Sequence, residues 1–171
     1  ELTHAMLDVT NDEAVRRTLG HAKPDVIVNG AAFNDVEGAE DRPVEALNLN
    51  AFAVRSLARA AIDCGSALVH YSTDFVFDGK ATQPYTETDA TNPRGVYAAS
   101  KLMGEWFARE APRAYVLRVE SLFGSVPGAR PAKGSVATIL KALRSGAEAR
   151  VFEDRTISPT YVFDAAIATR A

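Results

Sequence analysis

Short apolar runs alternate with longer segments of helical periodicity along most of this sequence. Val26-Ile27-Val28 is wholly apolar, which is typical of a strand buried on both faces of a parallel sheet, and Ala67 to Tyr71 is a second short apolar run. Between them, apolar residues recur at helical spacing from Pro43 to Cys64, and Gly65 stands where that helix would end. Parallel neighbours need right-handed crossovers, which such helices supply. The alternation therefore predicts an α/β fold with a doubly wound, Rossmann-like parallel sheet.

The rest of the chain follows the same order of elements. We expect residues 2–7 to close a strand, and Thr10-Asn11-Asp12-Glu13 has the form of a capping box that opens a helix over 11–22. Further helices are expected over 96–110, over 135–144 and from Phe163 onward, and further strands over 115–119 and 150–152. Residues 75–94 contain Gly79, Pro84 and Pro93 among polar residues and indicate a long surface loop, a common location of functional residues.

Composition excludes several classes of function. The net charge is −3 and Lys and Arg are scattered rather than clustered, which argues against a nucleic-acid partner. No run approaches the roughly 18 apolar residues that a membrane-spanning helix needs. The single cysteine, Cys64, cannot form an internal disulfide and suits a reducing cytoplasm. His4, His21 and His70 are widely separated and show no ligand spacing, so no metal site is expected.

Tyr97 and Lys101 are the first candidates for chemistry. Their i,i+4 spacing places both side chains on one face of the expected helix. An adjacent ammonium favours the phenolate, so we expect Lys101 to lower the pKa of Tyr97 toward the working range. Tyr-x-x-x-Lys also occurs by chance, with the tyrosine in the core and the lysine in solvent. The hydroxyl of Ser72 or Thr73 at the end of the preceding strand, followed by a long loop, makes a shared site the better interpretation.

With these residues in view, the chain resembles the extended short-chain dehydrogenases/reductases, and within them the dTDP-4-dehydrorhamnose reductase family. The resemblance runs nearly end to end and is carried by segments in the family's order and spacing: residues 23–32 (Lys-Pro-Asp-Val-Ile-Val-Asn-Gly-Ala-Ala), 69–79 (Val-His-Tyr-Ser-Thr-Asp-Phe-Val-Phe-Asp-Gly), 84–87, 92–93, 96–97, 100–105 and 158–161. It implies an oxidoreductase that reduces the C4 keto group of a dTDP-4-dehydro-6-deoxy sugar with NADPH or NADH, in dTDP-L-rhamnose biosynthesis.

The resemblance also implies residue roles. Tyr97 would donate a proton to the C4 keto oxygen while hydride arrives from the reduced nicotinamide, and Lys101 would hold the nicotinamide ribose. Thr73 matches the hydroxyl that orients the reacting carbonyl, and Asp74 matches a position that contacts the sugar nucleotide. The residues that match cofactor-binding positions are Asp8 and Val9 beside the adenine, and Ala32, Phe33 and Asn34 against the cofactor, together with Tyr97 and Lys101.

Two features depart from the family pattern. The reductase pattern Arg-Thr-Ser-Trp is replaced by Arg118-Val119-Glu120-Ser121, so Ser121 stands where a substrate-contacting tryptophan is expected. The Gly-x-x-Gly-x-x-Gly turn that cradles the cofactor pyrophosphate has no match in the 171 residues. We therefore expect the chain to be a fragment: a partial NAD(P)-binding domain over 1–171, incomplete at the N-terminus, with the start of the substrate-binding portion in roughly 120–171.

Other interpretations remain open at this point. Another sugar-nucleotide epimerase or reductase would use the same Tyr and Lys, and the regulatory subunit of methionine adenosyltransferase resembles these reductases without acting as one. A homodimer is a further possibility. Two sets of residues are expected to have purely structural roles: the acidic residues Glu37, Glu40 and Asp41 as solvated charges at the start of a helix, and Trp106 and Phe107 as core.

Overall fold

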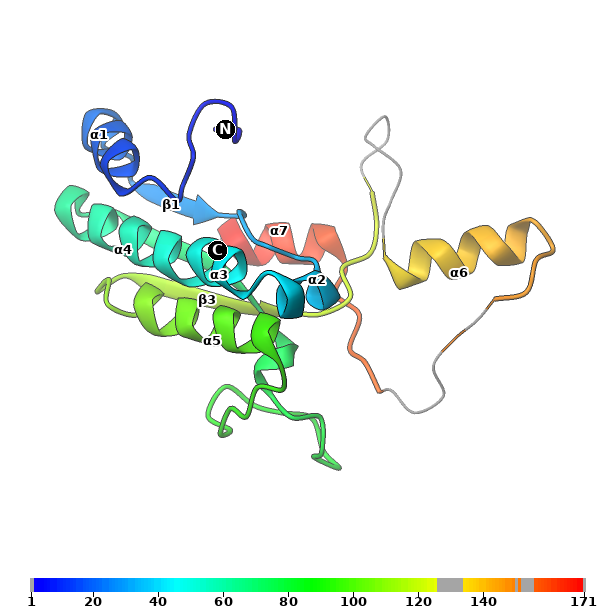
Figure 1. The fold of residues 1–171 in the computed structure, drawn as a ribbon. Helices are drawn as coiled ribbons and strands as arrows, with labels where there is room; N and C mark the ends of the chain where they lie inside the picture. The colour runs from blue at the N-terminus through cyan, green and yellow to red at the C-terminus, as the bar shows by residue number, and fades with distance from the viewer. Residues whose placement is uncertain (1, 126–133, 150, 152–155, 171) are drawn as a thin grey trace. The chain divides into compact units, whose positions relative to one another are not determined.

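The computed structural model describes residues 2–125, 134–149, 151 and 156–170 (Figure 1). The chain divides into two compact units, Glu1–Arg118 and Val119–Ala171. The first unit holds, in chain order, α1 (Asp12–Ala22), β1 (Val26–Asn29), α2 (Val36–Asp41), α3 (Pro43–Leu47), the π-helical turn η1 (Asn48–Phe52), α4 (Ala53–Cys64), β2 (Ala67–Thr73), the 3₁₀ turn η2 (Asp74–Val76), α5 (Val96–Ala108) and β3 (Ala114–Val119), whose last residue begins the second unit. The second unit holds α6 (Ser135–Arg144) and α7 (Val162–Arg170).

The three strands form one sheet in the order β1-β2-β3. β1 and β2 are parallel, with Val26 opposite Ala67 and Asn29 opposite His70. The amide of Leu68 donates to the carbonyl of Arg113 at 2.9 Å, so β2 and β3 begin at the same edge of the sheet and also run parallel. The α/β class and the parallel sheet are confirmed.

Helices α4 and α5 lie together on the sheet, with α1 against α4 (Figure 1). α4 contacts both β1 and β2, whereas α5 packs on β2. The apolar faces of α1 and α4 meet the inward residues of the strands in one core, whose largest members are Val15, Leu19, Ile27, Val54, Leu57 and Leu68. This core holds the helix that carries Tyr97 against the strand that carries Thr73.

Two expectations about the sheet were wrong. β1 is buried on one face only, because Val26 and Val28 are 48% and 51% exposed while Ile27 and Asn29 are buried. Residues 2–7 form a turn rather than a strand, since the amides of Met6 and Leu7 both donate to the carbonyl of Thr3. Leu7 nevertheless reaches the core, so its apolar character reflects burial and not strand pairing.

Helix boundaries follow the sequence closely, but their caps differ in detail. Asn11, not Thr10, caps α1 by accepting from the amide of Ala14 at 3.0 Å. Gly65 ends α4 in the left-handed conformation, as expected. The long helical segment from Pro43 is interrupted by the π turn η1, which no residue pattern had indicated. At the start of α5, the exposed Glu40 accepts from the amide of Val96 at 2.7 Å, so this carboxylate is a distant cap and not merely a solvated charge.

Trp106 does not lie in the core as expected. It is 58% exposed on α5, and Phe107 is only partly buried. α5 packs on β2 and buries Ala98, Leu102 and Ala108, whereas Trp106 lies on the exposed side of the helix.

The second unit has its own short pairing. Phe123 forms a parallel bridge with Tyr161, and the amide of Thr160 donates to the carbonyl of Glu120 at 2.9 Å. Ser121, at the position of the expected tryptophan, has a positive φ of 40°. The strand expected over 150–152 falls outside the described residues, apart from Val151, which has no regular structure. Among the described helices, none is both long and apolar enough to cross a membrane.

Candidate active site

Thr73, Asp74 and Tyr97 meet where β2 ends and α5 begins. Thr73 is the last residue of β2, and its hydroxyl accepts from the amide of Phe75 at 3.2 Å and donates to the Asp74 carboxylate at 3.1 Å. Tyr97, in the first turn of α5, packs its ring edge-on against Phe75 with 5.9 Å between ring centroids. The Thr73 side chain also acts on Tyr97 as a hydrogen-bonding group that lowers its pKa. The structure therefore brings together three residues that the sequence singled out separately.

The protonation of Tyr97 runs opposite to the expectation. Its pKa is raised, chiefly because the side chain is largely buried and also because the Asp74 carboxylate opposes the phenolate, while Thr73 partly offsets both. Lys101 is not among the causes, because its ammonium is directed to the carbonyl of Tyr71, 2.6 Å away. Tyr97 consequently keeps its proton at neutral pH, which suits a group that donates one.

Lys101 is a buried ammonium one helical turn after Tyr97. Burial lowers its pKa to about 8, and the carboxylate of Glu105 opposes this effect. An ammonium has three donors, and the hydrogen bond to Tyr71 uses one of them. Lys101 therefore has the donors and the position to bind a hydroxyl group beside Tyr97.

The residues that the resemblance matches to cofactor-binding positions occupy two places in the first unit. Ala32, Phe33 and Asn34 follow the carboxyl end of β1, at the same edge of the parallel sheet as Thr73. Asp8 and Val9 precede α1, where the amide and hydroxyl of Thr10 both donate to Asp8 and lower its pKa. Asp8 is therefore held as a carboxylate by local hydrogen bonds, and Val9 packs against the core.

Asn50 links the segment after β1 to α5, the helix that carries Tyr97. Its amide oxygen accepts from the backbone of Phe33 at 2.8 Å, and its amide nitrogen donates to the Phe33 carbonyl at 3.1 Å and to Ser100 Oγ at 2.9 Å. Ser100 in turn donates to the carbonyl of Tyr97 at 2.7 Å. Asn50 is fully buried within the π turn, so this turn places one amide between Phe33 and the helix of Tyr97.

Glu105 is a second buried polar centre on α5. Its carboxylate accepts from Ser72 Oγ at 2.6 Å and from Arg118 Nε and Nη2 at 2.8 and 2.7 Å. Arg109 adds a longer bond at 3.3 Å. The side chain is fully buried, so these donors balance its charge away from solvent.

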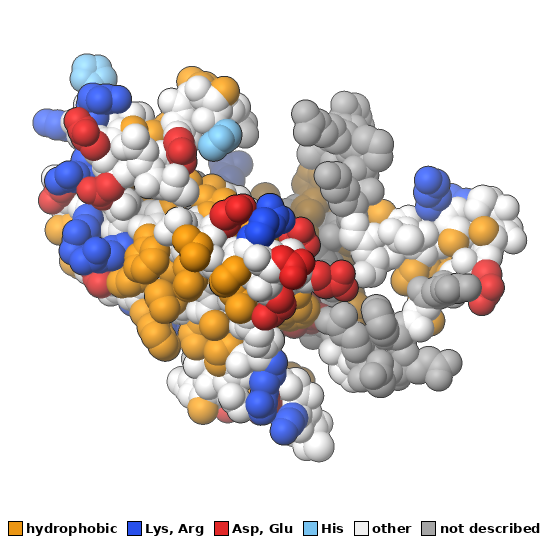
Figure 2. All heavy atoms as spheres, viewed as in Figure 1, with side chains coloured by type: hydrophobic (Ala, Val, Ile, Leu, Met, Phe, Trp, Pro, Cys, Tyr) orange, Lys and Arg blue, Asp and Glu red, His pale blue; other side chains and the backbone are white. Residues whose placement is uncertain are grey.

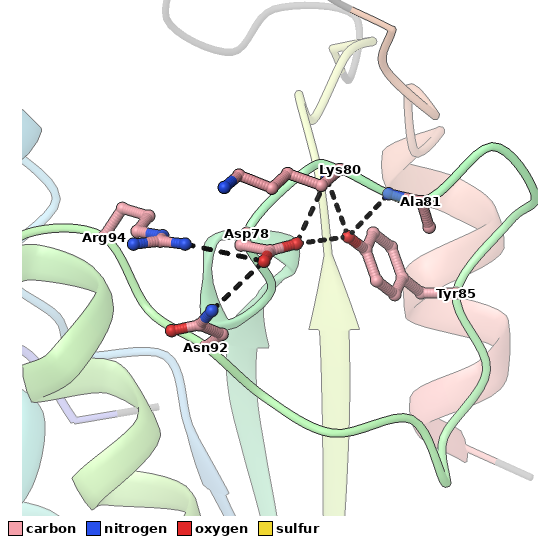
Figure 3. Close-up of polar contacts among 6 residues, drawn as sticks. All are labelled: Asp78, Lys80, Ala81, Tyr85, Asn92 and Arg94. Atoms are coloured by element: carbon pink, nitrogen blue, oxygen red, sulfur yellow. Dashed lines mark hydrogen bonds and ion pairs between the residues drawn. The ribbon is translucent and has the colours of Figure 1, made fainter.

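Asp78 organises the long loop after η2 (Figure 3). One carboxylate oxygen accepts from the Tyr85 hydroxyl at 2.8 Å and from the amide of Lys80, and the other accepts from Asn92 and faces Arg94. Tyr85 also stacks on Phe77 at 4.2 Å between centroids. These bonds lower the pKa of Asp78, so the loop is tied by a carboxylate at neutral pH.

Sequence reasoning missed Asn50, Glu105 and Asp78 as contributors to this site. Glu105 carried a usable signal, because it follows Lys101 by four residues and therefore lies on the same helix face. Asn50 carried none, since its role depends on a π turn.

His70 is buried on β2 and pairs with Asn29 at 3.1 Å. Burial and the nearby Lys101 lower its pKa to about 3, so it is neutral. The described residues contain no cluster of three or more His, Cys, Asp or Glu side chains that could hold a metal ion.

Comparison with known proteins identifies a matching family and close structural relatives. The family model described as the RmlD substrate binding domain matches residues 1–171. A dTDP-4-dehydrorhamnose reductase of Mycobacterium tuberculosis is 40% identical over 99% of this chain and 56% of its own length.

Two solved structures have the same fold. A dTDP-4-dehydrorhamnose reductase of Clostridium acetobutylicum superposes with a TM-score of 0.89 at 34% identity, covering 98% of this chain and 58% of its own. That of Bacillus anthracis, in complex with NADP, gives 0.91 at 30% identity, covering 99% and 59%. The chain thus spans between half and three fifths of the length of these relatives.

Proposed function

Because the chain belongs to the RmlD substrate binding domain family, we propose that the protein containing it is an NAD(P)H-dependent reductase of the C4 keto group of a dTDP-4-dehydro-6-deoxy sugar, acting in dTDP-L-rhamnose biosynthesis. The observation that carries the proposal is the meeting of Thr73, Tyr97 and Lys101 at the carboxyl edge of the sheet, where ligands bind in open α/β folds. The reductases to which the chain is similar support the substrate, and the NADP complex supports the cofactor.

The donors at this edge fit a nicotinamide cofactor. The Lys101 ammonium has donors for ribose hydroxyls, and Asn50 holds the backbone of Phe33, between Ala32 and Asn34, at the neighbouring strand end. Asp8 and Val9 are proposed to lie beside the adenine. A reduced nicotinamide bound there would supply the hydride.

The chain's own residues would supply the proton and the orientation. Tyr97 donates its proton to the C4 oxygen, and its raised pKa keeps that proton available at neutral pH. Thr73 donates its single hydroxyl proton to the same oxygen and so orients the carbonyl, while Asp74 contacts the sugar nucleotide. Lys101 would hold a ribose hydroxyl of the cofactor, with an ammonium that the Tyr71 carbonyl keeps in place.

The test is NAD(P)H oxidation by the complete protein with a panel of sugar nucleotides. We expect turnover with the dTDP-linked 4-keto-6-deoxyhexose, and Tyr97→Phe should lower kcat by about 100-fold, the usual contribution of general acid catalysis. Turnover of another sugar nucleotide only would favour an epimerase or a different reductase. Absence of turnover with every substrate, despite binding, would favour a regulatory subunit.

We also propose a homodimer formed through α4 and α5. Figure 2 shows hydrophobic side chains gathered over these helices. Trp106 and Phe52 are 58% and 48% exposed, and Phe52 packs on Phe107 at 6.1 Å between centroids. Monomeric proteins rarely leave such a patch uncovered. A cytoplasmic location, with neither nucleic acid nor a membrane as a partner, is part of the proposal and agrees with the single Cys64 and the scattered basic residues.

A further inference from the structure

The fully buried carboxylate of Glu105 joins three separate elements. It lies on α5, accepts from Ser72 near the end of β2, and forms a two-pronged ion pair with Arg118 near the end of β3. Such a pair fixes direction as well as distance, because both carboxylate oxygens receive a donor from the same planar guanidinium.

The residues around Glu105 adjoin Thr73 and Lys101, two of the residues proposed to act in the reaction. Ser72 precedes Thr73 in β2, and Lys101 lies one helical turn before Glu105 on α5. The Arg118 guanidinium lies over the ring of Phe77 at 4.9 Å, and Phe77 stacks on Tyr85 in the loop that Asp78 ties. A change at Glu105 would therefore reach the strand end, the ammonium and the loop together.

We propose that Glu105 is a positioning residue that locks the ends of β2 and β3 onto α5 and so holds Thr73 in place against Tyr97 and Lys101. This inference rests on the proposed reductase function. It explains why a charged group occupies a fully buried position, where an apolar residue of similar size often gives equal or greater stability.

Glu105 also acts on Lys101 through its charge. Glu105 raises the pKa of Lys101 against the effect of burial, whereas the nearby His70 from β2 is neutral. Arg109 and Arg118 face Glu105 itself, and Glu40 from α2 lies at the far N-terminal end of α5. Removing the Glu105 charge would therefore make Lys101 lose its proton at lower pH.

The experiment compares Glu105→Gln and Ser72→Ala with the matched control Glu110→Gln in the complete protein. Glu110 is exposed just beyond the end of α5, so its variant should match the parent. For Glu105→Gln we expect kcat to fall by about tenfold or more, as misplaced reacting groups cause, with KM within about twofold. The alkaline limb of kcat/KM and the NMR titration of ¹³C-labelled Lys101 should both move to lower pH.

Ser72→Ala keeps the ion pair, so it should fold even if Glu105→Gln does not. We expect it to lower kcat without moving the Lys101 titration. Parent-like kcat in Ser72→Ala, or parent-like kcat and titration in a folded Glu105→Gln, would overturn the inference.

If the parent reduces no keto sugar, the proposed function fails, but Glu105 can still be judged. The Phe75 amide, which donates to Thr73 Oγ1, should then exchange its hydrogen faster in both variants than in Glu110→Gln. Unchanged exchange would refute the positioning role.

Discussion

Gly104→Ala is expected to destabilise the protein, although alanine is the better helix former. Gly104 lies within α5, and a Cβ added there would come closer than 3.0 Å to the backbone carbonyl of Asn50 and within 3.2 Å of His70 Nε2. A backbone carbonyl in a buried turn cannot rotate away, so α5 itself must move. Overpacking of this kind costs up to about 3 kcal/mol, and the helix propensity of alanine offsets about 1 kcal/mol of that.

The net loss is therefore about 2 kcal/mol, which for a protein of this size lowers Tm by about 4–8 °C. Gly20→Ala is the matched control, because Gly20 lies in α1 with no atom within 4 Å of the added Cβ. That variant should raise Tm by about 1–4 °C through the same propensity. Thermal unfolding followed by circular dichroism measures both. A Gly104→Ala protein as stable as the Gly20→Ala protein would refute the argument that α5 and η1 are in backbone contact.

Three further changes test the site and its surroundings. The pH profile of kcat/KM should fall on the alkaline side near pH 8, because burial lowers the pKa of Lys101 to about 8 and the proposed reaction needs the ammonium; activity undiminished up to pH 10 would contradict that need. Asp78→Asn should raise KM for the sugar nucleotide more than it lowers kcat, since it weakens the bond to Tyr85 and the pairing with Arg94 that shape the loop, and steady-state kinetics separates the two effects. Trp106→Glu should convert a dimer to a monomer in analytical ultracentrifugation, while Met6→Glu, at an equally exposed apolar site outside α4 and α5, should not.

Lys101 also links the site to stability. Its pKa in the folded state is lowered, so between about pH 8 and the ordinary lysine value the unfolded chain binds more protons than the folded one. The contribution of Lys101 to the free energy of unfolding therefore rises with pH across that window. Below pH 8 the buried ammonium destabilises the folded state. A cofactor hydroxyl that accepts from Lys101 would reduce this cost, which predicts tighter binding of cofactor below pH 8 than above it.

Local patterns predicted much of this fold because they report local physics. The apolar run at Val26 to Val28 and the left-handed stop at Gly65 depend on neighbouring residues only, and both elements were found where expected. Exposure is different, since it depends on what packs against an element. Val26, Val28 and Trp106 are apolar residues expected to be buried, and each is about half exposed or more.

The sequence predicted those features of the candidate site that depend on a single helix or strand. It did not predict those that depend on contacts between several elements. The spacing of Tyr97 and Lys101 is a property of one helix, and the sequence placed both on it. The direction of the Tyr97 pKa shift was wrong, because it depends on burial between β2 and α5 and on the ammonium of Lys101 turning to the Tyr71 carbonyl. The spacing of Tyr97 and Lys101 does not show whether the ammonium contacts a backbone carbonyl or the phenol.

Two buried polar side chains, Asn50 and Glu105, hold α5 in place at different turns of the helix. Asn50 ties the first turns of α5, through Ser100, to the backbone after β1, and Gly104 lets the helix approach the carbonyl of the same Asn50. Glu105 ties the next turn to the ends of β2 and β3. Leaving a buried donor or acceptor without a partner costs more free energy than the hydrogen bond itself contributes. Each of these hydrogen-bonded connections therefore resists small displacements of the helix. Lys101 lies between these ties, and the Tyr97 carbonyl accepts from Ser100 at the first of them, so both side chains are held to the geometry of the sheet edge and not to that of an isolated helix.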